Sequence, residues 1–167
     1  TKRHYLYSKM NFLILGKPNV GKTSLYNILS GNHENIIHKT TGTTRDWHIS
    51  KFIYNKNINI YDTPGIIINN KNNLDKNFFE LLPQIDVLIY VIDYKDENYT
   101  NDIISLNLFR KFNKEILLII NKDDNLKEDK NSKIFGIKNT FYLSCSHKLG
   151  LEKIINFLNE YNPEKIS

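Results

Sequence analysis

The sequence predicts an α/β fold in which helices cover both faces of a mostly parallel sheet. Uninterrupted apolar runs within residues 11–15, 86–93 and 116–120 are typical of strands that are buried on both faces. Segments with helical periodicity lie between them, and the recurring order of strand, helix and strand requires parallel pairing through right-handed crossovers. A chain of 167 residues has the size of one domain with a full hydrophobic core.

The first strand leads into residues 16–23, which match the pattern G-x-x-x-x-G-K-[ST] in full. A helix is expected over residues 24–29, and Gly31 stands where a C-terminal cap belongs. A strand, a glycine-containing loop and a helix N-terminus in this order favour phosphate binding, because backbone N–H groups and the helix dipole face an anion. We expect Lys22 to reach the terminal phosphates and the Thr23 hydroxyl to hold Mg²⁺.

Residues 32–50 lose apolar periodicity, so we expect a long loop that contains the threonine cluster of residues 40–44. A threonine hydroxyl brought over a nucleotide can complete a Mg²⁺ shell, although Ser, Thr and Gly are also ordinary loop residues. Alternation at residues 49–54 and 58–61, with an Asn-rich break at residues 55–57, predicts a β-hairpin.

A D-x-x-G pattern at residues 62–65 follows this hairpin. The carboxylate of Asp62 comes at the end of a strand, where it suits a Mg²⁺ role, and Gly65 lets a backbone N–H approach a terminal phosphate closely. The pattern is weak alone and becomes informative because a phosphate-binding loop precedes it.

The remaining elements complete the alternation of strands and helices. A short helix is expected over residues 77–82, and the polar residues 125–138 connect to a last strand at 139–143. The helix predicted over residues 101–112 has an apolar stripe formed by Ile103, Ile104, Leu108, Phe109 and Phe112. The helix predicted over residues 149–161 is amphipathic, with one apolar face formed by Leu151, Ile154, Ile155 and Leu158.

Polar residues 121–124 stand at the carboxyl end of the strand at 116–120, the edge where open α/β sheets bind ligands. The Asp124 carboxylate can accept both donors on the Watson–Crick edge of guanine, while Asn121 and the Lys122 stem position and cover the ring. Unpaired polar groups disfavour the wrong base by about 1–3 kcal/mol each. The alternative is a charged turn at a strand end.

Residues 144–146 end the last strand at the same edge. A small side chain there lets backbone N–H groups meet the base carbonyl. Cys145 is expected to be a small buried residue and not a nucleophile.

The composition bounds the partners and the compartment. The net charge of +5 and the pI of about 9.1 suit an RNA or ribosomal partner, but the absence of alanine and the abundance of Asn, Lys and Ile indicate AT-rich codon bias, which inflates lysine regardless of function. The single Cys145 excludes an internal disulfide framework and fits a reducing compartment. No apolar run approaches a membrane span. The AT-rich codon bias suggests a reduced bacterial, symbiont or parasite genome, so a bacterial cytoplasm or an organelle of bacterial origin is expected.

With these motifs in register, residues 10–161 resemble a translation-factor-class GTPase domain. Within that class the chain resembles the EngA (Der)-type domain of the EngA/Era/TrmE group, through Gly-Lys-Pro-Asn-Val-Gly-Lys-Thr and Gly-Thr-Thr-Arg-Asp. Further stretches that lean toward EngA are residues 84–86, 101–103, 144–147 and 150–151. The resemblance implies a three-layer P-loop GTPase (Ras-like) fold with a mostly parallel six-stranded sheet. The GTPase domain is expected at residues 10–162, an N-terminal extension at 1–9 and a C-terminal tail at 163–167.

The resemblance also implies a function: hydrolysis of GTP to GDP and phosphate in ribosome assembly, with a ribosomal subunit or rRNA as partner. The alternatives are an Era- or TrmE-like GTPase acting on rRNA or in tRNA modification, and a GTP/GDP-binding module with negligible turnover. Mg²⁺ is an implied cofactor, and K⁺ is one in cation-stimulated members. Ile66 stands where Ras-like proteins carry a water-orienting Gln, so slow intrinsic turnover is expected.

The resemblance assigns roles to individual residues. The catalytic residues are Lys22, Thr44 and Gly65. The ligands of Mg²⁺ are Thr23, Asp62 and Thr44, with Thr43 as the alternative to Thr44, and Asn19 matches a K⁺ ligand. The nucleotide-binding residues are Asn19, Val20, Gly21, Lys22, Thr23, Ser24, Asn121, Lys122, Asp124, Ser144, Cys145 and Ser146.

Overall fold

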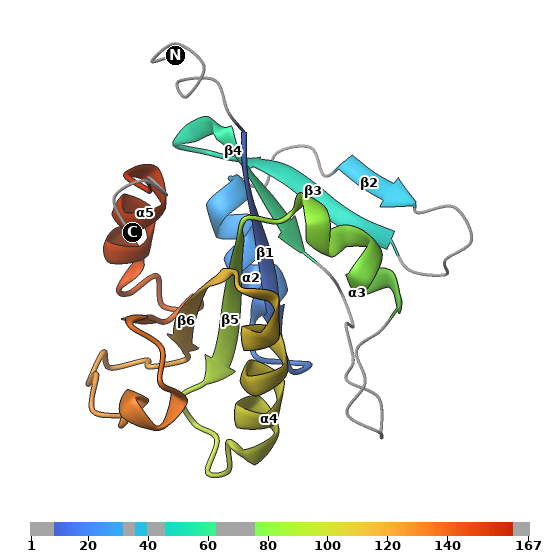
Figure 1. Ribbon diagram of the computed structural model, residues 1–167. Helices are drawn as coiled ribbons and strands as arrows, with labels where there is room; N and C mark the ends of the chain where they lie inside the picture. The colour runs from blue at the N-terminus through green and yellow to red at the C-terminus, as the bar shows by residue number, and fades with distance from the viewer. Residues whose placement is uncertain (1–8, 32–35, 40–45, 63–75, 162–167) are drawn as a thin grey trace.

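The computed structural model describes residues 9–31, 36–39, 46–62 and 76–161 (Figure 1). Its centre is one seven-stranded sheet with the strand order β2-β3-β4-β1-β5-β6-β7. Strands β4, β1, β5, β6 and β7 are parallel to one another, while β2 and β3 add an antiparallel edge. The strands are β1 (Met10–Gly16), β2 (Ile36–Lys39), β3 (Asp46–Phe52), β4 (Asn55–Asp62), β5 (Val87–Asp93), β6 (Glu115–Asn121) and β7 (Asn139–Tyr142).

Helices cover both faces of the sheet, as Figure 1 shows. Helices α2 (Lys22–Ser30) and α5 (Leu151–Asn159) contribute to one hydrophobic cluster, and helices α3 (Lys76–Leu81) and α4 (Thr100–Phe109) contribute to the other. Short 3₁₀ helices complete the described elements: η1 (Leu82–Gln84), η2 (Arg110–Phe112) and η3 (Ser132–Phe135).

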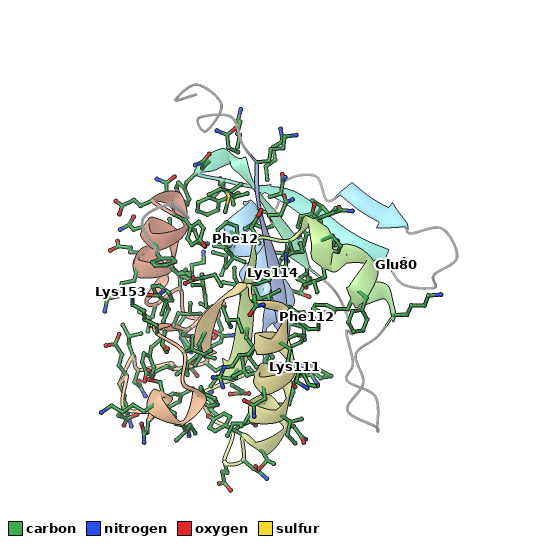
Figure 2. The ribbon with its side chains drawn as sticks, viewed as in Figure 1. Phe12, Glu80, Lys111, Phe112, Lys114 and Lys153 are labelled. Atoms are coloured by element: carbon green, nitrogen blue, oxygen red, sulfur yellow. The ribbon has the colours of Figure 1, made fainter. Side chains whose placement is uncertain are left out.

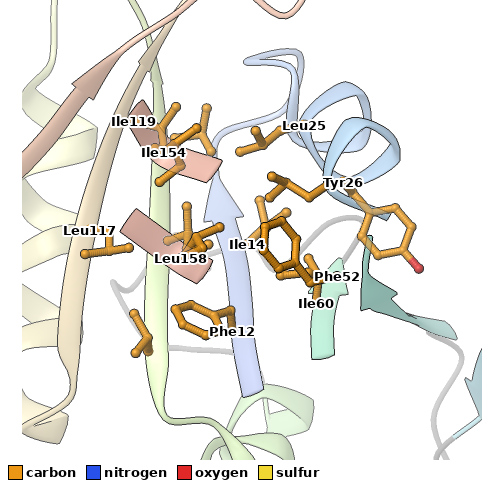
Figure 3. Close-up of a cluster of buried hydrophobic side chains, with 14 of the residues drawn as sticks. Phe12, Ile14, Leu25, Tyr26, Phe52, Ile60, Leu117, Ile119, Ile154 and Leu158 are labelled. Carbon is orange, nitrogen blue, oxygen red and sulfur yellow. The ribbon is translucent and has the colours of Figure 1, made fainter. Parts of the chain in front are cut away.

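The central strands supply both hydrophobic clusters because successive side chains of a strand point to opposite faces. In β1, Phe12 and Ile14 belong to the cluster under α2 and α5, which Figure 3 shows, while Leu13 and Leu15 belong to the cluster under α3 and α4. All four side chains are at most 2% exposed. A strand covered on both faces is therefore continuously apolar, which is the pattern that the sequence displays.

Aromatic rings join the two helices of the second face. Phe112, labelled in Figure 2 beside α4, packs against Phe78 and Phe79 of α3 with ring centroids 5.6 and 5.8 Å apart. Phe78 also contacts Phe109 of α4 at 5.4 Å. This aromatic cluster fixes α3 against α4 over the same face of the sheet.

The predicted fold class is confirmed, and the described sheet has one strand more than the six expected. The prediction of an unbroken loop over residues 32–50 is wrong, because β2 lies within it and β3 begins at Asp46. These edge segments pair with each other antiparallel, Ile36 opposite Ile49 and Lys39 opposite Asp46. Backbone pairing at a sheet edge needs no apolar periodicity, so the sequence pattern did not show it.

The β-hairpin is confirmed, but its turn lies earlier than predicted. Strand β3 ends at Phe52, and the Asn-rich residues 55–57 belong to β4. The turn consists of Ile53 and Tyr54, which are 46% and 59% exposed. A register shift between Lys51 and Phe52 buries Phe52 and leaves the next two apolar residues in the turn.

The predicted stripe of the helix at residues 101–112 is only partly correct. Phe109 is buried, and Ile103 and Phe112 pack against the cluster under α3 and α4. The buried face of α4 carries Asp102, Ser105, Leu106 and Phe109, whereas Ile104 and Leu108 are only partly buried. Apolar residues surround most of this helix, and two buried positions are polar, so hydrophobic periodicity could not identify the face. The α-helix also ends at Phe109 and continues as the 3₁₀ helix η2.

Two other helix predictions are confirmed. Gly31 caps α2 in the left-handed conformation, with φ of 66°, and its N–H group donates to carbonyls of the last turn. On α5, Ile154 and Leu158 are fully buried, and Leu151 and Ile155 pack beside them.

Replacement of Leu158 by alanine tests whether α5 seals the first face of the sheet. Leu158 is 0% exposed among the side chains of Figure 3, so we expect Leu158→Ala to lower the free energy of unfolding by about 2–5 kcal/mol. Urea denaturation measures this change. Asn156→Ala on the exposed side of the same helix is the control and should cost roughly 0.5 kcal/mol or less. A loss below about 1 kcal/mol for Leu158→Ala would contradict the burial described here.

Candidate nucleotide-binding site

The phosphate-binding loop, residues 16–23, joins the carboxyl end of β1 to the start of α2 at the centre of the sheet. A Cβ atom on Gly16 would lie 2.5 Å from the Val91 carbonyl oxygen of β5, and one on Gly21 would lie 2.2 Å from Asn121 Nδ2. Only glycine fits at these two positions, because the loop backbone is in close contact with Val91 of β5 and with Asn121 of β6. The pattern therefore reflects a loop that is built against the strands beside it.

Lys22 is held inside the curve of this loop. Its Nζ atom donates to the carbonyl oxygens of Gly16 at 2.8 Å and Lys17 at 2.6 Å. Burial lowers the pKa of the Lys22 ammonium below its ordinary value, and the Asp62 carboxylate opposes that shift. Among the described residues, no side chain caps the N-terminus of α2, so no side chain competes with an anion for its first N–H groups.

Thr23 and Asp62 meet at this loop. Asp62 is the last residue of β4, which lies beside β1, and the Thr23 hydroxyl donates to Asp62 Oδ2 at 3.3 Å. Hydroxyl and carboxylate oxygens are the ligands that Mg²⁺ prefers. Within the described ranges, no three His, Cys, Asp or Glu side chains gather into a metal site, so a metal here needs further oxygens such as those of a phosphate.

Asn121 connects the phosphate-binding loop to the loop after β7. Its side-chain amide donates to the Val20 carbonyl oxygen at 2.8 Å and accepts the backbone N–H of Cys145 at 3.0 Å. The residue is 3% exposed, so both hydrogen bonds are shielded from water. The sequence predicted that Asn121 would position a base, and the structure adds that it holds two loops of the site together.

Lys122 lies over the phosphate-binding loop. Its Nζ atom donates to the Asn19 carbonyl oxygen at 2.7 Å and pairs with Asp93 Oδ2 at 2.8 Å. Both Asn19 and Lys122 have left-handed backbones, with φ of 66° and 70°. The aliphatic stem of Lys122 therefore spans the gap between β6 and the loop. Its predicted role of covering a base ring stays a prediction.

Asp124 presents a partly exposed carboxylate at the same edge. Ser144 Oγ donates to Asp124 Oδ1 at 2.8 Å, and the Lys95 ammonium lies 2.6 Å from Asp124 Oδ2. His147 Nε2 is 3.7 Å from Asp124 Oδ1. The hydrogen bonds from Lys95 and Ser144 lower the pKa of the Asp124 carboxyl, so it is ionised and oriented at neutral pH.

The remaining predicted site residues lie at this edge, in α2 or outside the described part of the chain. Cys145 is buried, and burial raises the pKa of its thiol to about 11, in agreement with a structural residue and not a nucleophile. Ser146 is exposed, with its hydroxyl 3.4 Å from that of Ser144. Ser24 is exposed in the first turn of α2. Thr43, Thr44, Gly65 and Ile66 lie outside the described residues, so their assigned roles remain predictions.

Sequence reasoning missed a group of charged residues at the end of β5 and in the segment after it. Asp93, Lys95, Asp96 and Asp102 contact site residues across the edge of the sheet. The signal was available, since Asp93 ends a buried parallel strand and a run of charged residues follows it. None of the motifs used for the site includes these residues, although residues 101–103 are among the stretches that lean toward EngA.

The site consists of a phosphate-binding loop, a strand-end Asp beside its Thr, and a carboxylate edge joined to the loop by Asn121. The family model described as 50S ribosome-binding GTPase matches residues 11–122. The chain belongs to this family. The predicted class, a GTPase with a P-loop, is thereby confirmed.

Curated relatives carry the name GTPase Der. That of Campylobacter jejuni (strain RM1221) is 30% identical over 161 residues, which cover 93% of this chain and 35% of the relative. That of Campylobacter lari is 33% identical over 160 residues, which cover 90% of this chain and 35% of the relative. The chain thus spans about a third of the length of these relatives. The predicted resemblance to the EngA (Der) type is confirmed by these names.

Solved structures share the fold. A mutant S. thermophilus NFeoB bound to mGDP has a TM-score of 0.74 at 22% identity, covering 96% of this chain and 64% of that chain. The G domain of the T. maritima FeoB iron transporter has a TM-score of 0.66 at 23% identity, covering 92% of this chain and 98% of that chain. Within the described ranges of the present chain, no helix has the length and hydropathy that crossing a membrane requires.

Alkylation of Cys145 tests whether the thiol is a buried structural group. With a pKa of about 11 against an ordinary 9.0, its thiolate fraction at pH 8 is roughly a hundredfold lower than that of a free thiol. We therefore expect iodoacetamide to modify native Cys145 at least about a hundredfold more slowly than the urea-unfolded chain. Glutathione in the same urea solutions corrects for the solvent. A native rate within about tenfold of the unfolded rate would be incompatible with this environment.

Proposed function

We propose that this chain is a guanine-nucleotide-binding switch domain that hydrolyses GTP to GDP and phosphate and acts in ribosome assembly as an EngA (Der)-type GTPase. The family description and the names of the relatives support this proposal. The single observation that carries it is the joining of the phosphate-binding loop to the Asp124 edge through the two hydrogen bonds of Asn121. A nucleotide needs both ends of such a site at a fixed separation. A bacterial cytoplasm is the compartment that suits this role.

In this proposal the chain recognises the two ends of the nucleotide separately. Lys22 and the N–H groups of the loop bind the terminal phosphates. The ionised Asp124 carboxylate accepts the ring N–H and the amino group of guanine, two donors that adenine does not present together on that edge. Lys122 covers the ring, and the Ser144 hydroxyl keeps the carboxylate oriented.

The fit of Mg²⁺ to this site is good, because Thr23 and Asp62 place hard oxygen ligands beside the phosphate-binding loop. Thr44 would complete the set. When bound, Mg²⁺ neutralises charge on the phosphate oxygens. Asp62 holds the Thr23 hydroxyl in place, and Lys22 supplies the second positive charge on the phosphates.

Hydrolysis by this chain is expected to be slow without help. Ile66 follows the D-x-x-G pattern, and an apolar side chain cannot orient water. Stabilisation of the transition state is then mostly electrostatic, from Lys22 and the loop N–H groups. A monovalent cation near Asn19 or a ribosomal partner would supply the remainder, and the switch between GTP and GDP states would carry the function.

Replacement of Asp124 by asparagine tests the base assignment. Asparagine offers a donor in place of one acceptor, which suits xanthine, whose ring carries a carbonyl where guanine carries an amino group. We expect Asp124→Asn to raise the ratio of xanthine to guanine nucleotide affinity by roughly tenfold to a hundredfold. Displacement of labelled nucleotide measures both affinities. Asp129→Asn, at an exposed position in the same connection between β6 and β7, is the control. Unchanged selectivity for GTP would show that the base binds elsewhere, and displacement by ATP as effective as by GTP would refute guanine specificity.

Phosphate release in KCl and in NaCl tests the role of Asn19. We expect K⁺ to accelerate hydrolysis by the unmodified chain and to have no effect on Asn19→Gly, because glycine removes the side chain and readily adopts the left-handed backbone of this position. Asn113→Gly is a matched control, since Asn113 is also left-handed, with φ of 55°, at the end of η2. Persistence of the K⁺ effect in Asn19→Gly would remove Asn19 from the cation site.

The same assay separates an enzyme from a binding module. If GTP binds but neither cation gives turnover above background, with or without ribosomal subunits, the chain acts by binding alone. Stimulation by isolated rRNA or by tRNA, and not by ribosomal subunits, would favour the Era- or TrmE-like alternative.

A further inference from the structure

The side chain of Lys17 leaves the phosphate-binding loop and enters a cluster of acidic residues at the start of α4. Lys17 Nζ lies 3.0 Å from Asp96 Oδ2 and 3.0 Å from Asp102 Oδ2. The Asp102 side chain is 0% exposed, and the Lys17 side chain is 29% exposed. One ammonium group is thus placed between two carboxylates, one of which has no access to water.

Asp102 is held from a second direction by the sheet. Its Oδ1 atom accepts the hydroxyl hydrogen of Tyr90 at 2.8 Å, and Tyr90 is a buried residue of β5. Asp102 itself lies in the first turn of α4. The carboxylate therefore joins three elements, namely a central strand, a helix N-terminus and, through Lys17, the phosphate-binding loop.

Charge explains why Lys17 stays in this position. A buried carboxylate without a counter-charge is unfavourable, and Lys17 is the cation that reaches Asp102. Although burial lowers the pKa of the Lys17 ammonium, Asp102 and Asp96 together raise it above its ordinary value. The lysine is accordingly charged at neutral pH and attracted to both carboxylates.

The backbone of Lys17 has a separate contact with the phosphate-binding side of the loop. Its carbonyl oxygen accepts the Lys22 ammonium at 2.6 Å, and the Gly16 carbonyl accepts it at 2.8 Å. The side chain of Lys17 therefore pairs with Asp102, while its backbone carbonyl contacts Lys22. The ion pairs of the side chain and the contact of the carbonyl with Lys22 therefore belong to the same residue of the loop.

We propose that Lys17 and Asp102 are positioning residues for the phosphate-binding loop, which hold Lys22 where it binds the β-phosphate of a guanine nucleotide. This inference rests on the proposed function. Residue 17 is a variable position of the loop pattern, and residue 102 lies outside every motif used for the site, so neither was assigned a role above. The ion pair between Lys17 and Asp102 gives both residues a role in the site.

Binding of GDP and GMP to the Lys17→Met variant tests this proposal. GMP lacks the β-phosphate, so its binding does not depend on the contact that Lys22 makes there. We expect Lys17→Met to lower the preference for GDP over GMP by about tenfold, the effect of losing one hydrogen bond to a charged group. Calorimetry measures GDP binding, and displacement of labelled GDP measures GMP binding. A purely structural defect that lowers the folded fraction weakens both nucleotides equally and leaves the preference unchanged, which would overturn the proposal.

A second variant separates positioning from charge compensation and serves if Lys17→Met does not fold. Lys17→Met/Asp102→Asn removes both charges and retains an acceptor for the Tyr90 hydroxyl. We expect the preference for GDP over GMP to remain low in this variant. Recovery of the unmodified preference would show that Lys17 only neutralises Asp102, and the proposal would be wrong.

Two further variants complete the design. Lys17→Arg keeps the positive charge and should retain the preference within about threefold, and a loss as large as that of Lys17→Met would contradict a role for the ion pair. Lys153 lies on α5, and Lys153→Met removes its exposed ion pair with Glu128. This variant should leave nucleotide binding unchanged. If the unmodified chain binds no GDP, the proposed function fails; if it binds GDP and Lys17→Met keeps the preference, only the present inference fails.

Discussion

The side-chain amide of Asn121 makes the two buried hydrogen bonds on which the geometry of the site depends. One ends on the phosphate-binding loop and the other on the loop after β7, so residues far apart in the sequence are held at a fixed separation. Both partners are backbone groups, which cannot rotate away as side chains do. A buried backbone group that lost this partner would remain unsatisfied, at a cost of about 1–3 kcal/mol. The amide is therefore required at this position, where a residue of similar size without hydrogen-bonding groups would not serve.

Around this link, the charged groups of the site are already paired in a regular arrangement. At the end of β5, Asp93 pairs with Lys122. In the segment after β5, Lys95 pairs with Asp124 and Asp96 pairs with Lys17. Each of these ion pairs joins the carboxyl end of one strand to that of its neighbour in the sheet. Together they connect the phosphate-binding loop with the Asp124 edge of the site. Side chains that are ordered before a ligand arrives lose less conformational freedom on binding. The arrangement is thus suited to binding a charged ligand with little rearrangement of the described residues.

The local motifs of the site were predictable from the sequence. The buried face of α4 and the edge strand β2 were not. The loop at residues 16–23 has glycines where its backbone contacts β5 and Asn121, and those two contacts explain why the pattern requires them. The buried face of α4 was predicted only in part, because Asp102 and Ser105 are buried on it while Ile104 and Leu108 are partly exposed. The buried Asp102 is tolerated only because Lys17 and Tyr90 reach it. A helix whose core face contains a paired charge violates the rule from which periodicity is read. The edge strand β2 escaped prediction for a related reason, since its pairing with β3 is a property of backbone groups.

By itself the sequence determined the parallel α/β class, the phosphate-binding loop, the strand-end Asp62 and the polar edge at residues 121–124. These features depend on residue type and local spacing, which a single chain displays directly. Only the tertiary structure decided which polar groups meet. Lys17 contacts Asp96 across 79 positions of sequence, and Asn121 contacts the Val20 carbonyl across 101. The order of strands in the sheet brings those residues together, and strand order follows from how the whole chain packs. The constellation at the end of β5 is for that reason a property of the fold, although every residue in it was visible in the sequence.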